Sequence, residues 1–185
     1  MILIMLFVLI GVSILLIWQF VGYPLLMATI ALEAKPRAKD YTYQPFVSIL
    51  VPTYNEESVI AKRLENLLNL NYPKDNYEII VVDSGSLDRT VSIAQGILRG
   101  HGNLNPQMKV IQEKERRGKA SAINFGKRYA SGDLVLVTDA NATFDPDVLL
   151  EIMPHFKDPE VGAVGGRYCV ANPEDALAAP TSFYW

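Results

Sequence analysis

The sequence predicts an α/β fold: a mostly parallel sheet with helices on both faces, preceded by one N-terminal transmembrane helix. Two observations support this prediction. Residues 1–32 contain no charged side chain, whereas the 17 basic and 20 acidic residues all lie at or beyond Glu33. From residue 46 onward, short runs rich in Val and Ile alternate with segments whose apolar residues recur every three or four positions. Such alternation is typical of strands joined by helices.

Residues 1–32 are expected to form a transmembrane or interfacial helix. About 20 apolar residues are enough to cross the roughly 30 Å core of a bilayer, so residues 2–22 span it alone. Pro24 is expected to kink the helix or to begin a short interfacial one. Trp18 and Tyr23 stand where interfacial aromatic residues are common. A cleaved signal peptide is the alternative, but no basic residue precedes the apolar run, which is about twice the usual length.

The charges after the apolar segment predict its orientation. Lys35, Arg37 and Lys39 follow the segment and no basic residue precedes it, so the positive-inside rule places the rest of the chain in the cytoplasm. We therefore expect a single-pass protein of a prokaryotic plasma membrane, with membrane lipid as one partner. Residues 33–45 are interpreted as a linker, and residues 46–185 as the soluble domain.

Each element of the soluble domain follows from its apolar pattern. Continuous apolar runs indicate buried parallel strands. Ile60, Leu64 and Leu67 indicate one face of a helix, and Pro146 suits the first turn of another. Three glycines interrupt the final strand-like run. The expected order is strand 46–51, helix 57–70, strand 77–83, helix 87–98, strand 108–112, helix 119–130, strand 134–138, helix 146–156 and strand 161–170.

Composition and missing motifs exclude several classes of function. A net charge of −3 gives no support for nonspecific nucleic-acid binding. The single cysteine, Cys169, excludes an internal disulfide and a cysteine-rich zinc site. His101 and His155 are interpreted as surface residues, and the sequence contains neither a P-loop nor a G-x-G-x-x-G motif. Ligands of parallel sheets bind beyond the carboxyl ends of the strands, here residues 52–57, 83–88, 113–119 and 139–145.

Acidic and amide side chains follow two of the expected strands. Asp83 ends a run that is otherwise apolar, and a charge at that position needs a polar partner, such as a nucleotide base or ribose. Asp139 and Asn141 follow a later strand and could together meet one Mg²⁺ or Mn²⁺ ion, since these ions prefer oxygen ligands. An Asx turn is the alternative interpretation of Asp139. Ser86 and Asp88 are interpreted as helix caps.

A basic segment, residues 114–119, lies between these two acids in the sequence. Lys119 is expected to begin a helix, where a cation is unfavourable beside the helix dipole, so an anionic partner is expected for it. Lys114, Arg116 and Arg117 are interpreted as parts of a solvated charged loop.

These residues resemble the motifs of glycosyltransferase family 2, which has the Rossmann-like GT-A fold. The resemblance extends over residues 46–170. It implies an inverting enzyme of the hexosyltransferase type, which transfers a sugar from a nucleotide-diphosphate sugar to an acceptor hydroxyl. The N-terminal helix is similar to that of processive or lipid-linked members. The matching segments are VSILVPTYNEE (47–57), VVDSGSLDRT (81–90), RGKASAINFG (117–126) and TDAN (138–141).

The resemblance implies a role for each matching residue. Asp83 would contact the base, usually uracil, which points to a UDP-sugar donor. Lys119 would lie near the donor phosphates or sugar. Asp139 would be the first acid of the D-x-D metal motif, which binds Mg²⁺ or Mn²⁺, and Asn141 replaces the second acid. Pro52, Tyr54 and Glu56 would lie along the nucleotide.

The resemblance leaves the acceptor side open. No catalytic residue is identified in this chain, and the family's general base is expected downstream of Trp185. Residues 46–185 are therefore interpreted as the donor-binding half of a domain that is incomplete at its C-terminus, with a polysaccharide, lipid-linked or other acceptor. The alternatives are a non-catalytic nucleotide-sugar-binding membrane protein, a decayed fragment and, third, a nucleotidyltransferase. The central expectation is that Asp83 and Asp139 stand at neighbouring strand exits and hold one nucleotide sugar.

Overall fold

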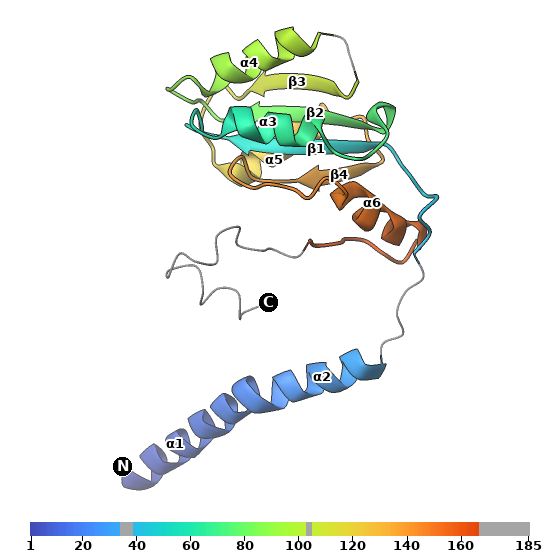
Figure 1. The fold of residues 1–185 in the computed structure, drawn as a ribbon. Coiled ribbons are helices and arrows are strands. Elements are labelled where there is room, and N and C mark those ends of the chain that lie inside the picture. The colour runs from blue at the N-terminus through green and yellow to red at the C-terminus, as the bar shows by residue number, and fades with distance from the viewer. Residues whose placement is uncertain (34–38, 103–104, 167–185) are drawn as a thin grey trace, which may run out of the picture. The chain divides into compact units, whose positions relative to one another are not determined.

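The computed structural model describes residues 1–33, 39–102 and 105–166. The chain divides into an N-terminal unit, Met1–Ala38, and a second unit, Lys39–Trp185, and each is described by itself (Figure 1).

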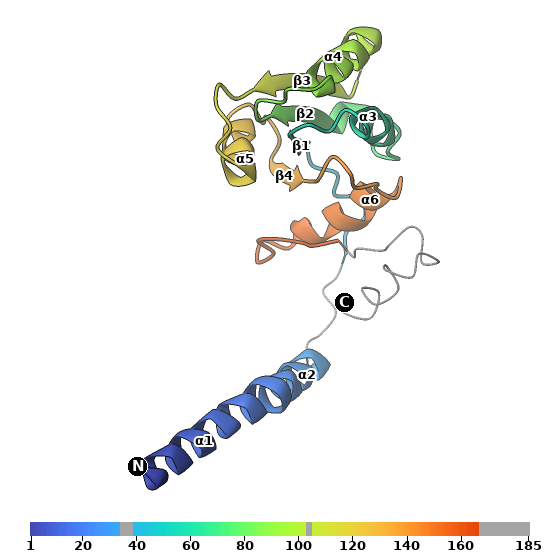
Figure 2. The ribbon, with the colours of Figure 1, turned by 90° about the vertical axis from the view of Figure 1, so that its left-hand side faces the viewer.

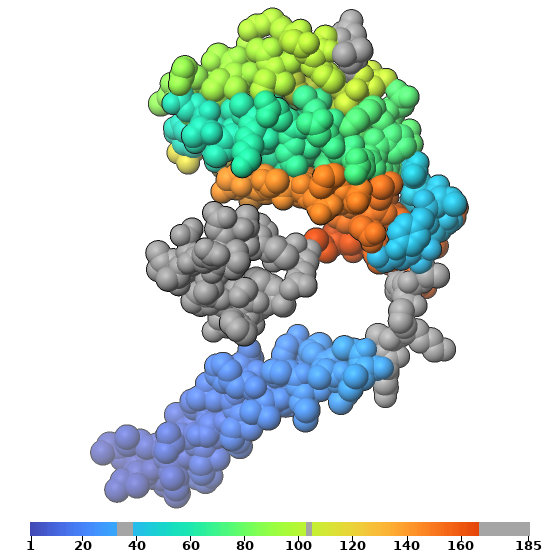
Figure 3. Space-filling model, viewed as in Figure 1, coloured from blue at the N-terminus to red at the C-terminus, as the bar shows by residue number. Residues whose placement is uncertain are grey.

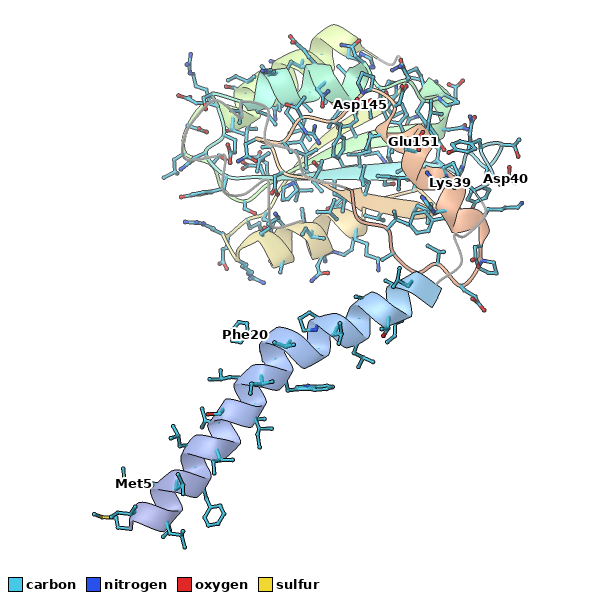
Figure 4. All side chains as sticks on the ribbon, turned by 60° about the horizontal axis from the view of Figure 1, so that its bottom comes forward. Met5, Phe20, Lys39, Asp40, Asp145 and Glu151 are labelled. Carbon is cyan, nitrogen blue, oxygen red and sulfur yellow. The ribbon has the colours of Figure 1, made fainter. Side chains whose placement is uncertain are left out.

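The N-terminal unit contains one helix that is apolar on all sides. It comprises α1 (Ile2–Ile17), a π-helical turn (Trp18–Gly22) and α2 (Tyr23–Glu33), and side chains such as Met5 and Phe20 project from it (Figure 4). The residues Ile2–Leu32 are long and apolar enough to cross a membrane, a test that a signal sequence also passes.

Pro24 neither ends this helix nor begins a separate one. The Tyr23 N–H donates to the Trp18 carbonyl, five residues back, so the helix widens by one residue just before the proline. Proline has no N–H to donate, and a π-helical turn is a common way to insert an extra residue into a helix. The expected second helix is therefore the continuation of the first.

The second unit is built on a four-stranded parallel sheet with the strand order β3-β2-β1-β4. Its strands were expected from the apolar runs, and the prediction of a parallel α/β fold is confirmed. The strands are β1 (Val47–Thr53), β2 (Tyr77–Asp83), β3 (Gln107–Gln112) and β4 (Leu134–Val137).

Helices cover both faces of this sheet (Figure 2). In the space-filling view, residues of α3 and α4 form the surface over one face (Figure 3). The α-helices are α3 (Ile60–Leu68), α4 (Thr90–His101), α5 (Lys119–Lys127) and α6 (Val148–Ile152), and short 3₁₀ helices cover Lys74–Asn76 and Met153–Lys157.

Alternate strand residues point to opposite faces and build two cores. Ile49 and Ile79 belong to the larger core, which includes α3, α4 and α6. Leu50 and Val82 belong to the smaller core under α5. A Cβ at Gly126 of α5 would lie 2.7 Å from Cγ2 of Val82, so a glycine is required for this close approach of helix and sheet.

Several elements differ from the sequence prediction. The helices expected at 87–98 and 119–130 are Thr90–His101 and Lys119–Lys127. The helix expected at 57–70 begins only at Ile60, because side chains from the next loop bind the backbone of residues 56 and 57. The helix expected at 146–156 changes to a 3₁₀ helix at Met153, next to Pro154, which lacks an N–H. Residues 161–166 form no strand, and the remainder of the expected strand 161–170 lies outside the described residues.

The segment before β1 contacts α6 and the turn after it. Lys39 Nζ donates to Glu151 Oε2 at 3.1 Å, and the Asp40 N–H donates to the Pro154 carbonyl at 3.4 Å (Figure 4). Residues 39–45 are therefore attached to the second unit.

Candidate functional site

A cavity of about 320 Å³ lies at the carboxyl edge of the sheet. This volume is at the small end of the range for small-molecule sites. The lining residues come from all four segments that the sequence singled out, and they include five of the six proposed donor-binding residues. They are Pro52, Thr53, Tyr54, Glu56, Ser84, Arg116, Gly118, Lys119, Ala122, Asp139, Ala140 and Asn141.

The loops after β1 and β2 bind each other through side chains. The Asn55 N–H donates to Ser86 Oγ, and the Leu87 N–H donates to Asn55 Oδ1, both at 2.9 Å. The Glu56 N–H donates to Thr90 Oγ1 at 2.7 Å, and Thr90 is fully buried. These bonds hold Tyr54 and Glu56 in place at the cavity.

Ser86 and Asp88 are not the helix caps that the sequence predicted, because the N-cap residue of α4 is Arg89, which makes no side-chain cap hydrogen bond. Ser86 accepts its bond from the neighbouring loop, and Asp88 Oδ2 accepts from the Glu57 N–H at 3.1 Å. Asp88 Oδ1 accepts from the backbone and hydroxyl of Thr90. Although desolvation acts to raise it, the pKa of Asp88 is lowered, because the hydrogen bonds from Thr90 and Glu57 favour the carboxylate.

Asp83 is fully buried and is absent from the cavity lining. Its Oδ2 accepts from the backbone N–H groups of Gly85 and Ser86, both at 3.1 Å, and from Gln112 Nε2 at 3.4 Å. Among the described residues, its Oδ1 has no hydrogen-bond partner. A buried polar atom without a partner is costly, and a donor that reached this oxygen would remove that cost, but in this structure the oxygen is buried and does not open into the cavity.

Glu113 connects the exit of β2 to α5. Its two carboxylate oxygens accept from Ser84 Oγ and Ser121 Oγ, both at 2.7 Å. Gly118, with a φ of 88°, adopts a conformation that other residues rarely take, and it places Lys119 at the start of α5. Glu113 on one side and Gly118 on the other therefore fix the basic segment, residues 114–119, beside the cavity.

Lys119 and Asp139 form an ion pair in the cavity lining. The side chains are 57% and 54% exposed, so the pair is open to solvent. The expected anionic partner of Lys119 is thus a carboxylate of the chain itself.

Arg116 is exposed, as expected of a solvated loop, but it also lines the cavity. Its guanidinium carbon lies 3.8 Å from the centre of the Tyr54 ring, close enough for a cation–π interaction. Arg117 instead pairs with the exposed Glu115, at 3.1 Å. The sequence offers no signal that separates the two arginines, because the contact with Tyr54 depends on how two distant loops meet.

Asp139 and Asn141 offer one carboxylate and one amide oxygen to the same cavity. Within the described residues, no group of three or more His, Cys, Asp or Glu side chains is placed to hold a metal ion by itself. Mg²⁺ is commonly held by one or two carboxylates together with water and substrate phosphates. The donor set therefore fits an ion that shares its coordination with a phosphate ligand.

Arg63 is a residue that sequence reasoning missed. It is 2% exposed, and Arg63 Nη2 donates to the hydroxyl of Thr138, directly before Asp139. Burial lowers its pKa to about 10, while the charge of Asp139 acts in the opposite direction. A signal was present: Arg63 lies three residues after Ile60 and four before Leu67, on the apolar face of α3.

Asp83 and Asp139 lie at the same edge of the sheet but not at neighbouring strands. β1 separates β2 from β4, so two strand spacings, about 10 Å, lie between the two strand ends. A ligand that reaches both acids has to extend across the end of β1, where Pro52 and Tyr54 line the cavity.

Comparisons with known proteins agree on one family. Residues 48–184 match the model of Glycosyl transferase family 2. A beta-monoglucosyldiacylglycerol synthase of Nostoc sp. is 37% identical over 147 residues, which cover 77% of this chain and 31% of the relative. A poly-beta-1,6-N-acetyl-D-glucosamine synthase of Staphylococcus epidermidis is 33% identical over 132 residues, covering 71% and 30%. The chain spans about a third of the length of these curated relatives.

Two solved structures extend the comparison to ligands. A mannosyltransferase of Pyrobaculum calidifontis, in complex with GDP-Man and Mn²⁺, is 39% identical with a TM-score of 0.73, covering 89% of this chain and 48% of its own. TarS of S. aureus, residues 1–349 in complex with UDP-GlcNAc, is 27% identical with a TM-score of 0.54, covering 66% and 37%.

Proposed function

Because the chain belongs to glycosyl transferase family 2 and has the GT-A fold, we propose that it binds a nucleotide-diphosphate sugar for inverting transfer to an acceptor hydroxyl at a membrane. The observation that carries this proposal is the cavity at the carboxyl edge of the sheet. It brings together an aromatic ring, two cations, two carboxylates and an amide from three segments.

The two ends of the donor have different partners in this proposal. Asp83 receives an N–H of the base on its unpartnered Oδ1. Both uracil and guanine offer such a donor, in keeping with the UDP and GDP ligands of the two solved structures. Tyr54 lies along the nucleotide, and Arg116 and Lys119 bind the diphosphate.

Asp139 and Asn141 hold the divalent ion together with that diphosphate. A bound Mg²⁺ or Mn²⁺ neutralises charge that grows on the departing nucleoside diphosphate. The Lys119 ammonium changes its partner: it pairs with Asp139 when no ligand is bound and with the donor phosphates when the donor is bound. None of the acidic residues in the described part of the chain is assigned as the general base.

The N-terminal helix anchors this activity in the proposal. Residues Ile2–Leu32 span the bilayer and the second unit faces the cytoplasm, where nucleotide sugars are available to it. The acceptor is then lipid-linked or a polysaccharide at the membrane surface. Resistance of the full chain to carbonate extraction, and protease sensitivity of the second unit only in inverted vesicles, would test this arrangement.

Calorimetric titration of the full chain in detergent tests donor binding. We expect UDP-sugars or GDP-sugars to bind saturably, with an affinity that Mn²⁺ raises, and we expect Asp139→Ala to remove the effect of Mn²⁺. Asp133→Ala is the matched control, because Asp133 is an exposed acid directly before β4 whereas Asp139 follows that strand. Absence of saturable binding in both donor series would contradict the proposal.

A further inference from the structure

Two side chains of α3 hold both ends of the segment that carries Asp139 and Asn141. At its start, Arg63 Nη2 donates to Thr138 Oγ1. At its end, Asn66 Nδ2 donates to the Phe144 carbonyl and Asn66 Oδ1 accepts from the Phe144 N–H, both at 2.9 Å. Residues 139–143 therefore form a loop whose two ends are fixed from behind.

The two anchors are themselves connected. Arg63 Nη1 donates to Asn66 Oδ1 at 2.7 Å, so that one amide oxygen receives bonds from both the guanidinium and the Phe144 N–H. The guanidinium carbon also lies 4.1 Å from the centre of the Phe144 ring. Arg63, Asn66, Thr138 and Phe144 thus form one cluster, called here the loop anchor.

Packing alone does not explain why the buried residue at position 63 is a charged arginine. In the part of the chain that the structure describes, no ion pair includes Arg63, and its buried Nε has no hydrogen-bond partner. A buried cation without a carboxylate is costly, and an apolar side chain of similar size often serves stability as well or better. A neutral residue would also suit the apolar face of α3.

The position of the charge suggests what it does instead. The Thr138 hydroxyl that Arg63 binds belongs to the residue directly before Asp139, and the Asp139 charge acts on the guanidinium. A cation fixed below the loop attracts the Asp139 carboxylate and limits the positions that this carboxylate can take.

We propose that Arg63 is a positioning residue: with Asn66 it holds the loop 139–143 in the arrangement in which Asp139 and Asn141 face the cavity. The identity of the ligand in this inference rests on the proposed function, whereas the loop anchor rests on the contacts of Arg63 and Asn66 alone. It predicts that loss of Arg63 lowers the affinity for the metal ion at Asp139 and Asn141 and leaves binding of the base at Asp83 unchanged.

Binding of a nucleoside diphosphate, with and without Mn²⁺, separates these two ends. In the full chain, Arg63→Met is expected to lower the affinity for Mn²⁺ in the presence of UDP or GDP by about tenfold, the lower range for loss of a group that orients a metal ligand. The affinity for the same nucleotide without metal is expected to change less than about twofold, and Arg63→Lys is expected to recover part of the Mn²⁺ affinity.

Glu78→Gln is the matched control. Glu78 is also a charged residue that is only 1% exposed, and it lies at the opposite edge of the sheet, where it accepts bonds from Ser48, Lys109 and Ser131. We expect this variant to lower the unfolding temperature and to leave both affinities unchanged. Equal losses of both affinities in Arg63→Met, or no loss of Mn²⁺ affinity, would overturn the proposal.

Hydrogen exchange tests the loop anchor without any ligand. Amides 139–143 should exchange faster in Arg63→Met than in the wild-type chain, whereas amides 84–90 should not. Unchanged exchange at 139–143 would overturn the inference even if nucleotide binding were confirmed. A wild-type chain that binds no nucleotide would instead contradict the proposed function, so the two failures are distinguishable.

Discussion

The two sides of the cavity are held in different ways. On the β2 side, four backbone N–H groups of the loops after β1 and β2, two half-buried and two exposed, donate to the side chains of Asn55, Ser86, Asp88 and Thr90. On the β4 side, the cavity lining contains a solvent-exposed ion pair between Lys119 and Asp139, and the stronger contacts lie beneath it at Arg63. Exposed ion pairs contribute at most about 1 kcal/mol.

This difference matches what each side has to do in the proposed function. A base is recognised by groups that keep one arrangement, which a dense hydrogen-bond network supplies. When metal and diphosphate bind, Asp139 has to leave Lys119 and contact the metal ion. The exposed Lys119–Asp139 ion pair is weak enough to allow this, while Arg63 keeps the loop in place. Apart from Asp83, which is proposed to bind the base, residues of the β2 side are accordingly expected to respond to substitution through stability, and those of the β4 side through ligand affinity.

The largest effect on stability is expected for Thr90→Val. The hydroxyl of the fully buried Thr90 accepts from the Glu56 N–H, and valine of similar shape leaves that N–H without a partner. The free energy of unfolding should fall by about 1–3 kcal/mol, measured by urea denaturation. Ser92→Ala, which removes an exposed hydroxyl from the same helix, should change it far less. Equal effects would show that the loop network is not the source of stability.

Lys119→Met should act on affinity rather than stability. It removes the partner of Asp139 in the unliganded chain, so the affinity for Mn²⁺ alone should rise by about threefold, consistent with an exposed pair. Affinity for the nucleoside diphosphate should fall, because the ammonium no longer meets the phosphates. Lys127→Met, at the exposed end of α5, serves as the control. A fall in the affinity for Mn²⁺ alone would contradict the proposed exchange of partners.

Arg116→Gln should produce a smaller loss. The guanidinium that is proposed to bind the diphosphate is exposed, and exposed charge pairs contribute up to about 1 kcal/mol, or up to roughly fivefold in affinity for a nucleoside diphosphate. Arg117→Gln should have no effect on that affinity, since its partner is Glu115 on the surface. Equal losses in the two variants would indicate general charge attraction rather than a specific contact.

The smallest effect concerns acid stability of the β2 side. The pKa of Asp88 is lowered in the folded chain, so its stabilisation is fully present above its unfolded value of about 3.9 and is lost as the pH falls through its folded value. The free energy of unfolding should therefore depend less on pH below about 4 in Asp88→Asn than in the wild-type chain. Identical slopes would show that Asp88 is not held as a carboxylate by these bonds.

The sequence predicts the β2 side better than the β4 side. Apolar runs located all four strands of the sheet, and strand-end motifs located the loops, because both are local patterns. The bond from the Asn55 N–H to Ser86 Oγ was not predictable, since it joins residues about 30 positions apart whose distance depends on strand pairing.

The β4 side depends more on tertiary contacts. Arg63 and Phe144 are 81 positions apart in the sequence and meet only after α3 packs on the sheet. The expectation that the strands ending at Asp83 and preceding Asp139 are neighbours was wrong for the same reason: chain order does not reveal that β1 lies between β2 and β4. The family match favours sugar transfer over the nucleotidyltransferase alternative.

The central claim is that Asp83 and Asp139 hold opposite ends of one nucleotide sugar, and titration of the full chain with UDP, GDP and pyrophosphate, with and without Mn²⁺, tests it most directly. Asp83→Asn should weaken nucleotide binding by the same factor with and without Mn²⁺ and leave pyrophosphate binding unchanged. Asp139→Asn should remove the gain from Mn²⁺ without weakening binding in the absence of the metal, because it also releases Lys119 for the phosphates. If both variants bind all three ligands as the wild-type chain does, the claim is wrong.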